Sequence, residues 1–353
     1  MKVRTSDIVG LGLLAFVAAC RFSVPVADFY AERCYPVISS ALSRLAALVP
    51  FSLEEIVAIV FILIFITVLV RSIKRKEGFF RCLGKTGRVV MWLLVWVNLG
   101  WCGNYFRTPL YARLELEPAR FDAEAFESFL SEYTDILNGS AGSQATWDKE
   151  SLEQEIKDFY AAEATACGYT ALRPWQHVKK PLINPLFSAV TILGWMGPFF
   201  CETQVNLDLP ELEYPSVLAH ETAHLTGVTG EGEANYWAYA FCRQSDNPSV
   251  RYSGCMELFP YVAVNARALL SEEQYNAWLT KVSPRAKEDY NAIQEFWDGK
   301  RVRFIENVQR TLMDMFLRSK GISDGAKNYQ GVIGIIMTMD ARRTLAGGER
   351  VSI

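Results

Sequence analysis

Three apolar runs dominate the first 106 residues of the chain, at positions 8–20, 56–70 and 89–106. The first run follows Lys2 and Arg4, the second contains no charged residue, and the third is rich in tryptophan and tyrosine. Such aromatic residues are typical of the membrane interface. Because a bilayer core is spanned by about 20 helical residues, these runs predict three transmembrane helices once slightly extended.

The basic residues predict how these helices cross the membrane. The segment 71–88, between the second and third runs, contains seven Lys or Arg and one acidic residue. The positive-inside rule therefore places this segment in the cytoplasm. It also places the N-terminus inside and everything after about Arg107 outside the cytoplasm. The first run also has the length and basic flank of a signal peptide, but cleavage there would not change the position of the rear domain.

The rest of the chain has an ordinary soluble pattern and is interpreted as one domain, 107–353, behind a membrane domain, 1–106. Helical periodicity and flanking residues predict amphipathic helices, and an apolar stretch at 182–209, broken by glycines and a proline, contains an alternating strand at 199–209. The remaining possibility for 182–209 is a fourth membrane segment. The expected fold is mainly α, with a small sheet and a helical C-terminal part; the helices are predicted at 121–138, 147–165, 261–270, 272–283, 285–297 and 300–320.

Composition supports this division and excludes some functions. Half of the residues are apolar, mostly in the front part, and the net charge of −3 does not favour nucleic-acid binding. The eight cysteines include no CxxC pair, which excludes a zinc ribbon. Cys242 and Cys255 flank a turn signal at 246–248 and could form a disulfide outside the cytoplasm; the alternative is that they are buried small apolar residues.

The candidate chemistry lies in His220-Glu221-Thr222-Ala223-His224, which fits the pattern HExxH. Residues four apart share a helix face, so His220 and His224 can bind one metal ion, and Glu221 can act as general base on a metal-bound water. The preceding Pro215-Ser216 is a helix start signal, while glycines at 227 and 230 end the helix. The neighbouring residues are apolar, and a buried helix with two histidines and a glutamate would be costly without a function. The context predicts a Zn²⁺ site.

A third ligand is expected on the next helix. HExxH followed by Glu231-Gly-Glu-Ala-Asn235 resembles the gluzincin class of zinc metallopeptidases, in which a glutamate on a second helix completes the site. This resemblance implies a zincin-like domain with Glu231 as the third ligand. Some membrane-bound members have ExxAD there, and Asn235 stands where that pattern has Asp. This departure leaves Glu233 as the alternative third ligand.

A closer likeness extends over most of the chain. The membrane anchor, HETAHLTG, the following EGEAN and the late LRSKGISDGAKNY resemble an uncharacterised family of bacterial membrane-anchored HExxH proteins. The stretch GPFFCETQVN before the motif resembles that family too, and the likeness runs from the first apolar run to about Thr338. Metzincins are excluded because Gly230 occupies the position of their third ligand.

The expected function is a membrane-anchored zinc metallopeptidase that cleaves a peptide or protein substrate outside the cytoplasm, with Glu221 as general base on zinc-activated water. Its partners are the substrate and the lipid bilayer. Candidates for stabilising the oxyanion are Tyr252, Arg251 and His177, and the strand at 199–209 could pair with an extended substrate. The alternative is a catalytically inactive zincin-fold scaffold or sensor. Intramembrane proteolysis is disfavoured by the acidic residues of 211–235, and a structural zinc site would usually have four protein ligands.

Overall fold

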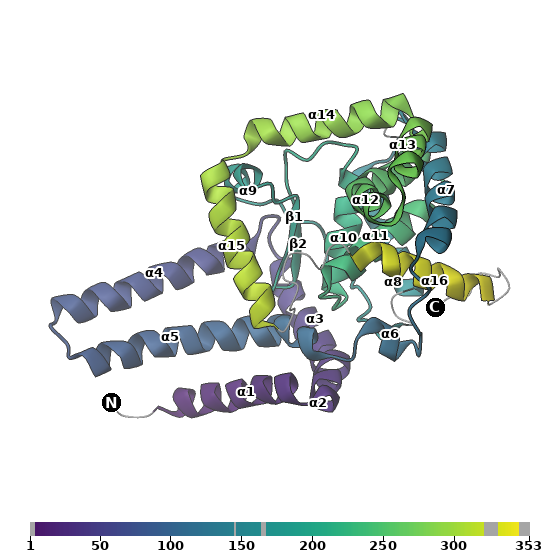
Figure 1. The fold of residues 1–353 in the computed structure, drawn as a ribbon. Helices are drawn as coiled ribbons and strands as arrows, with labels where there is room; N and C mark the ends of the chain where they lie inside the picture. Colours follow the sequence, from purple (N-terminus) through teal and green to yellow (C-terminus); the bar gives the residue numbers. More distant parts are fainter. Residues whose placement is uncertain (1–3, 145, 164–166, 321–330, 346–353) are drawn as a thin grey trace. The chain divides into compact units, whose positions relative to one another are not determined.

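The computed structural model describes residues 4–144, 146–163, 167–320 and 331–345 (Figure 1). These residues are mainly helical and contain one two-stranded sheet, as predicted. The chain forms two compact units. The first comprises residues 1–108, 173–182 and 196–204, and the second comprises residues 109–172, 183–195 and 205–353. Of the late segment LRSKGISDGAKNY, residues 321–329 lie outside the described part of the chain.

The helices of the first unit follow one another closely along the chain. Its elements are α1 (Thr5–Phe22), α2 (Val24–Phe29), a π-helical turn (Tyr30–Cys34), α3 (Tyr35–Ala46), α4 (Leu53–Lys74), α5 (Phe79–Gly100) and a 3₁₀ turn (Cys102–Phe106). Helix α5 contacts both α1 and α4, and the three helices lie alongside one another in Figure 1. They contain the first two apolar runs of the sequence and the third as far as Gly100.

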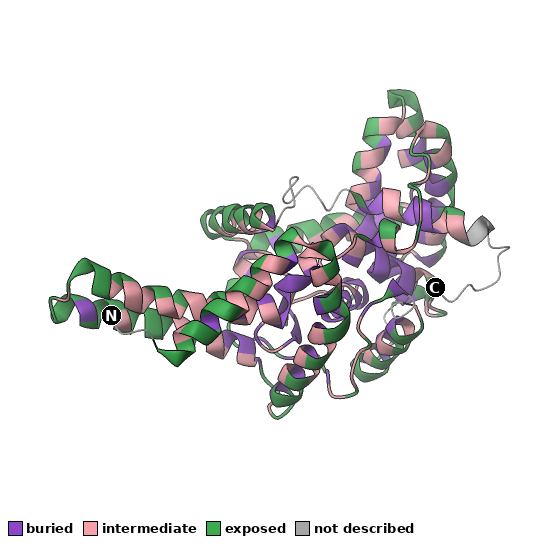
Figure 2. Ribbon diagram, turned by 90° about the horizontal axis from the view of Figure 1, so that it is seen from below, coloured by how far each residue is buried: buried purple, intermediate pink, exposed green. Residues whose placement is uncertain are grey.

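Two of these helices, α1 and α4, are the only described ones long and apolar enough to cross a membrane. Most side chains of α4 are exposed. In Figure 2 the helices near the N-terminus are largely green and pink. The predicted third span, 89–106, is not one continuous α-helix in the structure. Its helical part ends at Gly100 and belongs to α5, whose mean hydropathy is lowered by the basic residues Arg81, Lys85 and Arg88.

The start of α1 lies beside the basic part of α5. The guanidinium of Arg88 donates two hydrogen bonds to the carboxylate of Asp7, at 2.5 and 2.6 Å. One turn further, a Cβ on Gly10 would lie 2.5 Å from the methyl carbon of Met91. The two helices therefore begin at the same side of the first unit and run in the same direction.

The N-terminus of α4 is capped by a buried carboxylate from residues 196–204. Glu202, 3% exposed, accepts hydrogen bonds from the backbone N–H groups of Leu53 and Glu54, both at 3.0 Å. Glu54 in turn accepts a bond from the N–H of Phe199 at 2.8 Å. Because the first N–H groups of a helix have no partner within it, this exchange stabilises the beginning of α4.

A single hairpin forms the sheet. Strand β1 (Gly194–Gly197) pairs with β2 (Glu202–Val205), and four residues join them. The predicted strand at 199–209 is thus shorter than expected, and its first part is the turn of the hairpin. The described residues show no membrane-length helix over the predicted alternative span 182–209.

The second unit contains most of the helices. They are α6 (Leu110–Arg113), α7 (Ala123–Ser140), α8 (Lys149–Ala162), α9 (Asn184–Ala189), α10 (Tyr214–Leu225), α11 (Glu231–Gln244), α12 (Pro248–Leu269), α13 (Glu272–Lys281), α14 (Pro284–Lys300), α15 (Arg303–Ser319) and α16 (Val332–Leu345). The predicted helices at 121–138, 147–165, 272–283, 285–297 and 300–320 are confirmed with shifted ends. The helix predicted at 261–270 is the last part of the longer α12, which continues through Pro260.

The core of the second unit surrounds α10, α11 and α12. Helix α11 packs against both others, and α7 packs on α12. Trp237, Tyr133 and Tyr160 are among the largest fully buried side chains. Tyr160 donates a hydrogen bond to the carbonyl of Ala219 in α10, and Tyr133 donates one to the carbonyl of Cys255 in α12, both at 2.8 Å. This core holds the HExxH helix firmly in place.

The disulfide considered between Cys242 and Cys255 is not formed, since both cysteines are free and buried. They lie where α11 and α12 approach closely. A Cβ on Gly254 would be 2.4 Å from the Cβ of Cys242. The two thiols therefore behave as small apolar side chains in a tight helix–helix contact, which was the alternative to a disulfide.

Candidate metal centre

The HExxH motif lies on α10, as its flanking residues predict. Pro215 occupies the first turn of the helix, where its missing N–H is not needed. The helix ends at Leu225, and Gly227 then adopts a φ of +100°, a conformation that other residues rarely adopt. Gly230 caps α11, so the chain reverses within five residues and brings the start of α11 back to α10.

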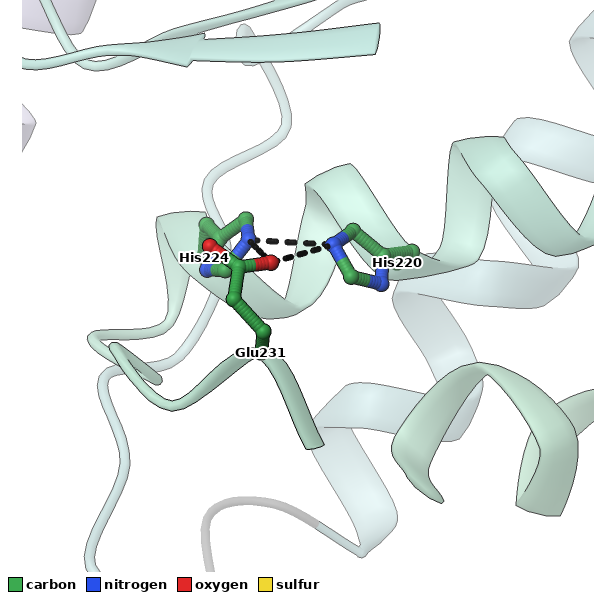
Figure 3. A group of neighbouring side chains, drawn as sticks. All are labelled: His220, His224 and Glu231. Carbon is green, nitrogen blue, oxygen red and sulfur yellow. Dashed lines mark hydrogen bonds and ion pairs between the residues drawn. The ribbon is translucent and has the colours of Figure 1, made fainter. Parts of the chain in front are cut away.

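Three polar atoms converge between these two helices (Figure 3). The Nε2 atoms of His220 and His224 are 3.2 Å apart, and one carboxylate oxygen of Glu231 is 3.2 Å from the first and 3.6 Å from the second. Among the described residues, this is the only group of three or more His, Cys, Asp or Glu side chains arranged to hold a metal ion.

The ring of His224 is fixed by a backbone partner. Its Nδ1 lies 2.8 Å from the carbonyl oxygen of Val228, in the loop after α10. Because a carbonyl can only accept, Nδ1 carries the hydrogen, and in the neutral ring Nε2 presents its lone pair to the cluster. This is the tautomer that a metal ligand requires. The sequence contained no sign of this partner, because any residue type supplies a carbonyl.

Glu231 and Glu233 point to different partners. Both lie in the first turn of α11, and residues two apart face opposite sides of a helix. Glu233 accepts a hydrogen bond from the hydroxyl of Tyr169, and the guanidinium of Arg113 lies 3.7 Å from the same carboxylate. The structure thus brings Glu231 to the two histidines and engages Glu233 elsewhere.

Glu221 is buried against the backbone of β1. A Cβ on Gly194 would lie 2.4 Å from the Cγ of Glu221 and 2.8 Å from one of its carboxylate oxygens. Only glycine leaves room for the Glu221 side chain in this position. The sequence pattern marked Gly194 merely as a break in an apolar stretch, since nothing local reveals a contact with a residue 27 positions away.

The charged groups of the cluster and the neighbouring Glu221 shift one another's pKa values. Burial opposes a charge on His224, but the carboxylates of Glu231 and Glu221 and the carbonyl of Val228 outweigh it and raise the pKa of His224 to about 9. The pKa of Glu231 is lowered, because the two histidines outweigh the effect of burial. Burial raises the pKa of Glu221 above its usual value, although both histidines oppose the change. A carboxylate with a raised pKa is a stronger base than an ordinary glutamate.

Two of the three candidates for oxyanion stabilisation make hydrogen bonds to other residues, and the third belongs to the first unit. The hydroxyl of Tyr252 donates a hydrogen bond to Asp289 at 2.7 Å, and Arg251 donates one to the carbonyl of Ser245 at 2.6 Å. His177 belongs to the first unit. These hydrogen-bond partners of Tyr252 and Arg251 lie outside the cluster of His220, His224 and Glu231.

Comparison with known proteins identifies a family. The sequence profile of a family described as protein of unknown function (DUF3810) matches residues 30–337. The resemblance seen in the sequence was expected to run from the first apolar run to about Thr338. The matched region ends close to Thr338, but it begins after α1. No curated protein and no solved structure matches the chain.

Proposed function

The chain belongs to the DUF3810 family, and from its site we propose that it is a membrane-anchored zinc metallopeptidase of the gluzincin type. The proposal rests on one observation, the convergence of His220, His224 and Glu231. Two imidazoles and one carboxylate are the ligands of many catalytic zinc sites, which keep the fourth position open for water. Glu221 lies on the same helix, next to the first ligand.

The spacing of the three atoms suits a zinc ion. Ligands about 2.0–2.1 Å from a tetrahedral zinc lie about 3.3–3.4 Å from one another. The distances here are 3.2, 3.2 and 3.6 Å. In its neutral form His224 presents the lone pair of Nε2 to the cluster, because Val228 holds the hydrogen of the ring on the other nitrogen. A zinc ion would therefore be bound with little rearrangement of the described side chains.

In the proposed hydrolysis the zinc ligands and Glu221 have different roles. A bound zinc ion polarises a water molecule and the substrate carbonyl. Glu221 takes a proton from the attacking water and delivers it to the leaving amine, so that it serves first as base and then as acid. Its burial against Gly194 keeps bulk water away from this carboxylate and limits its motion. The substrate is proposed to be a peptide or protein.

The proposed location follows from the first unit. Helices α1 and α4 could span a membrane, and the basic segment 71–88 would then lie in the cytoplasm. The bond between Asp7 and Arg88 supports this orientation, since it places the beginning of α1 on the same side as that segment. For the chain after α5 to lie outside the cytoplasm, together with the metal site, α5 must cross the membrane as well, with its basic residues Arg81, Lys85 and Arg88 toward the cytoplasm.

Metal analysis of the purified full-length chain in detergent tests the proposal directly. We expect one tightly bound zinc ion per chain and cleavage of a fluorogenic peptide mixture that stops when zinc is removed with a chelator. Activity should return when zinc is restored. A chain that binds no zinc would overturn the proposal. A chain that binds zinc but cleaves no peptide would leave a metal-binding protein of the scaffold or sensor class.

The variant Gly194→Ala should separate metal binding from catalysis. The added methyl group would overlap Glu221, so the carboxylate must move, and the three atoms nearest to the methyl group all belong to Glu221. Because misplacement by about 1 Å can cost about 100-fold in rate, we expect a loss of that size with zinc content unchanged. Gly299→Ala is the control, because a Cβ there meets nothing within 4 Å. Equal activity of the two variants would contradict the contact with Glu221.

Zinc affinity should depend on pH in a defined window. His224 must lose its proton to bind zinc, and its pKa is raised from 6.5 to about 9 in the metal-free protein. We therefore expect the affinity, measured by competition with a chelator, to rise from pH 6.5 to about pH 9 and then level off. In the metal-free protein the pair of His224 with Glu231 stabilises the fold fully below pH 6.5, and this contribution is lost as the pH rises to about 9. Its unfolding temperature should fall over the same window, and an increase would contradict the assignment.

A further inference from the structure

Helices α10 and α12 are joined one turn away from the metal centre. The backbone N–H of Ser216 donates a hydrogen bond to the hydroxyl of Ser253 at 3.1 Å, and the two hydroxyl groups are 3.0 Å apart. Residues four apart share a helix face. One turn beyond this contact, α10 carries His220 and α12 carries Glu257. The two side chains interact electrostatically, because the charge of His220 counteracts the rise that burial causes in the pKa of Glu257.

The two histidines differ in how their rings are held. His224 donates its Nδ1–H to the carbonyl of Val228, as described above. The Nε2 of His220 faces His224 and Glu231, but Nδ1 of His220 makes no hydrogen bond to another residue in the described part of the chain. A histidine that binds a metal almost always donates its other N–H to a carboxylate, carbonyl or water. Glu257 is the nearby carboxylate on the facing helix.

A small cavity lies beside Glu257, between α10, α11 and α12. Its volume is about 10 Å³, about that of one water molecule, and its lining includes Ser216, Asn235, Glu257 and Tyr261. Asn235 is 5% exposed, and its Nδ2 has no hydrogen-bond partner among the described residues. A water molecule in this cavity could accept a bond from Asn235 and donate one to Glu257. The second carboxylate oxygen of Glu257 then remains available for His220.

We propose that Glu257 is a positioning residue for the metal centre, whose carboxylate accepts the Nδ1–H of His220 and holds the ring with Nε2 toward the metal. Asn235 is neutral, so of these two residues only Glu257 adds to the negative charge that Glu231 and Glu221 already place near His220. The water-sized cavity satisfies the rest of its hydrogen-bonding capacity. This inference rests on the proposed zinc site, and it assigns a role to a residue on a third helix, 26 positions after Glu231.

The test is the zinc affinity of the full-length chain in detergent, measured by competition with a chelator for wild type and Glu257→Gln. Loss of an outer partner of a metal ligand typically costs 10- to 100-fold in affinity, so we expect about a tenfold to 100-fold loss. The absorption spectrum of the Co²⁺-substituted protein should shift, because the geometry of the His220 ligand changes. Glu288→Gln, at an exposed position of α14, is the matched control. The unfolding temperature of each metal-free variant monitors the fold.

The outcomes distinguish this inference from the function that it rests on. If wild type binds zinc and Glu257→Gln binds it equally well, with an unchanged Co²⁺ spectrum, the role of Glu257 is overturned and the zinc site stands. If wild type binds no zinc, both are overturned. If Glu257→Gln unfolds when metal-free, Glu257→Asp, which keeps the charge, takes its place. Affinity within about threefold of Glu288→Gln and an unchanged spectrum would then count against the inference, whereas a loss or a spectral shift would support it.

Discussion

Replacement of Glu221 by glutamine is expected to lower the rate of peptide hydrolysis by about 10³-fold and to leave the bound zinc in place. Glutamine has nearly the same shape and fits against Gly194, but it cannot accept a proton from the attacking water. General acid–base catalysis contributes about 10² to 10⁴ in rate, which sets the size of the loss. His220, His224 and Glu231 are unchanged in this variant, so the ligand set stays complete.

Zinc content and hydrolysis should be measured on the same preparation. Glu211→Gln serves as the control, because this glutamate is exposed and precedes α10 by three residues. Full activity in Glu221→Gln would exclude Glu221 as the base and with it the proposed mechanism. Loss of zinc in this variant would mean that Glu221 shapes the site instead of handling protons. Both results are judged by comparison with the zinc content and activity of Glu211→Gln.

Much of the helical framework could be predicted from local pattern. The amphipathic helices α7, α13 and α14 have strong periodicity, and the apolar run of α4 has no charge to interrupt it. Pro260 misled the prediction of α12, because proline removes a hydrogen bond and costs about 3 kcal/mol within a helix. Helix α12 continues because it packs against α7, α10 and α11. Contacts of this kind are not visible in a single segment.

The same limit applies to the candidate site. The positions of His220 and His224 follow from the helical repeat, and their spacing was sufficient to predict that they meet. Val228, Gly194 and Glu257 approach the site through the fold, from a loop, a strand and another helix. The third ligand was ambiguous because its identity depends on where α11 begins. With Glu231 as the first helical residue, its side chain faces α10 and that of Glu233 faces away.

The pair Glu231→Gln and Glu233→Gln should therefore behave in opposite ways. The first removes the only carboxylate among the three proposed ligands, so zinc affinity should fall by more than about 100-fold, beyond the loss typical of outer partners. The second leaves all three ligand atoms in place. Its zinc affinity should stay within about threefold of wild type. Both variants carry the same chemical change, two residues apart, so each is the matched control of the other.

Stability should fall in Glu233→Gln although its zinc affinity does not. Glu233 accepts a hydrogen bond from Tyr169 and pairs with Arg113, with side chains only 15% and 12% exposed for the glutamate and the arginine. Hydrogen bonds to charged groups contribute about 1.5–3 kcal/mol, so Glu233→Gln should lower the free energy of unfolding by an amount of this order. Because glutamine can still accept from Tyr169, the loss should fall at the lower end. Chelator competition and thermal unfolding of both variants measure the two effects. Zinc loss in Glu233→Gln with normal binding in Glu231→Gln would reverse the assignment, since it would require Glu233 to be the ligand.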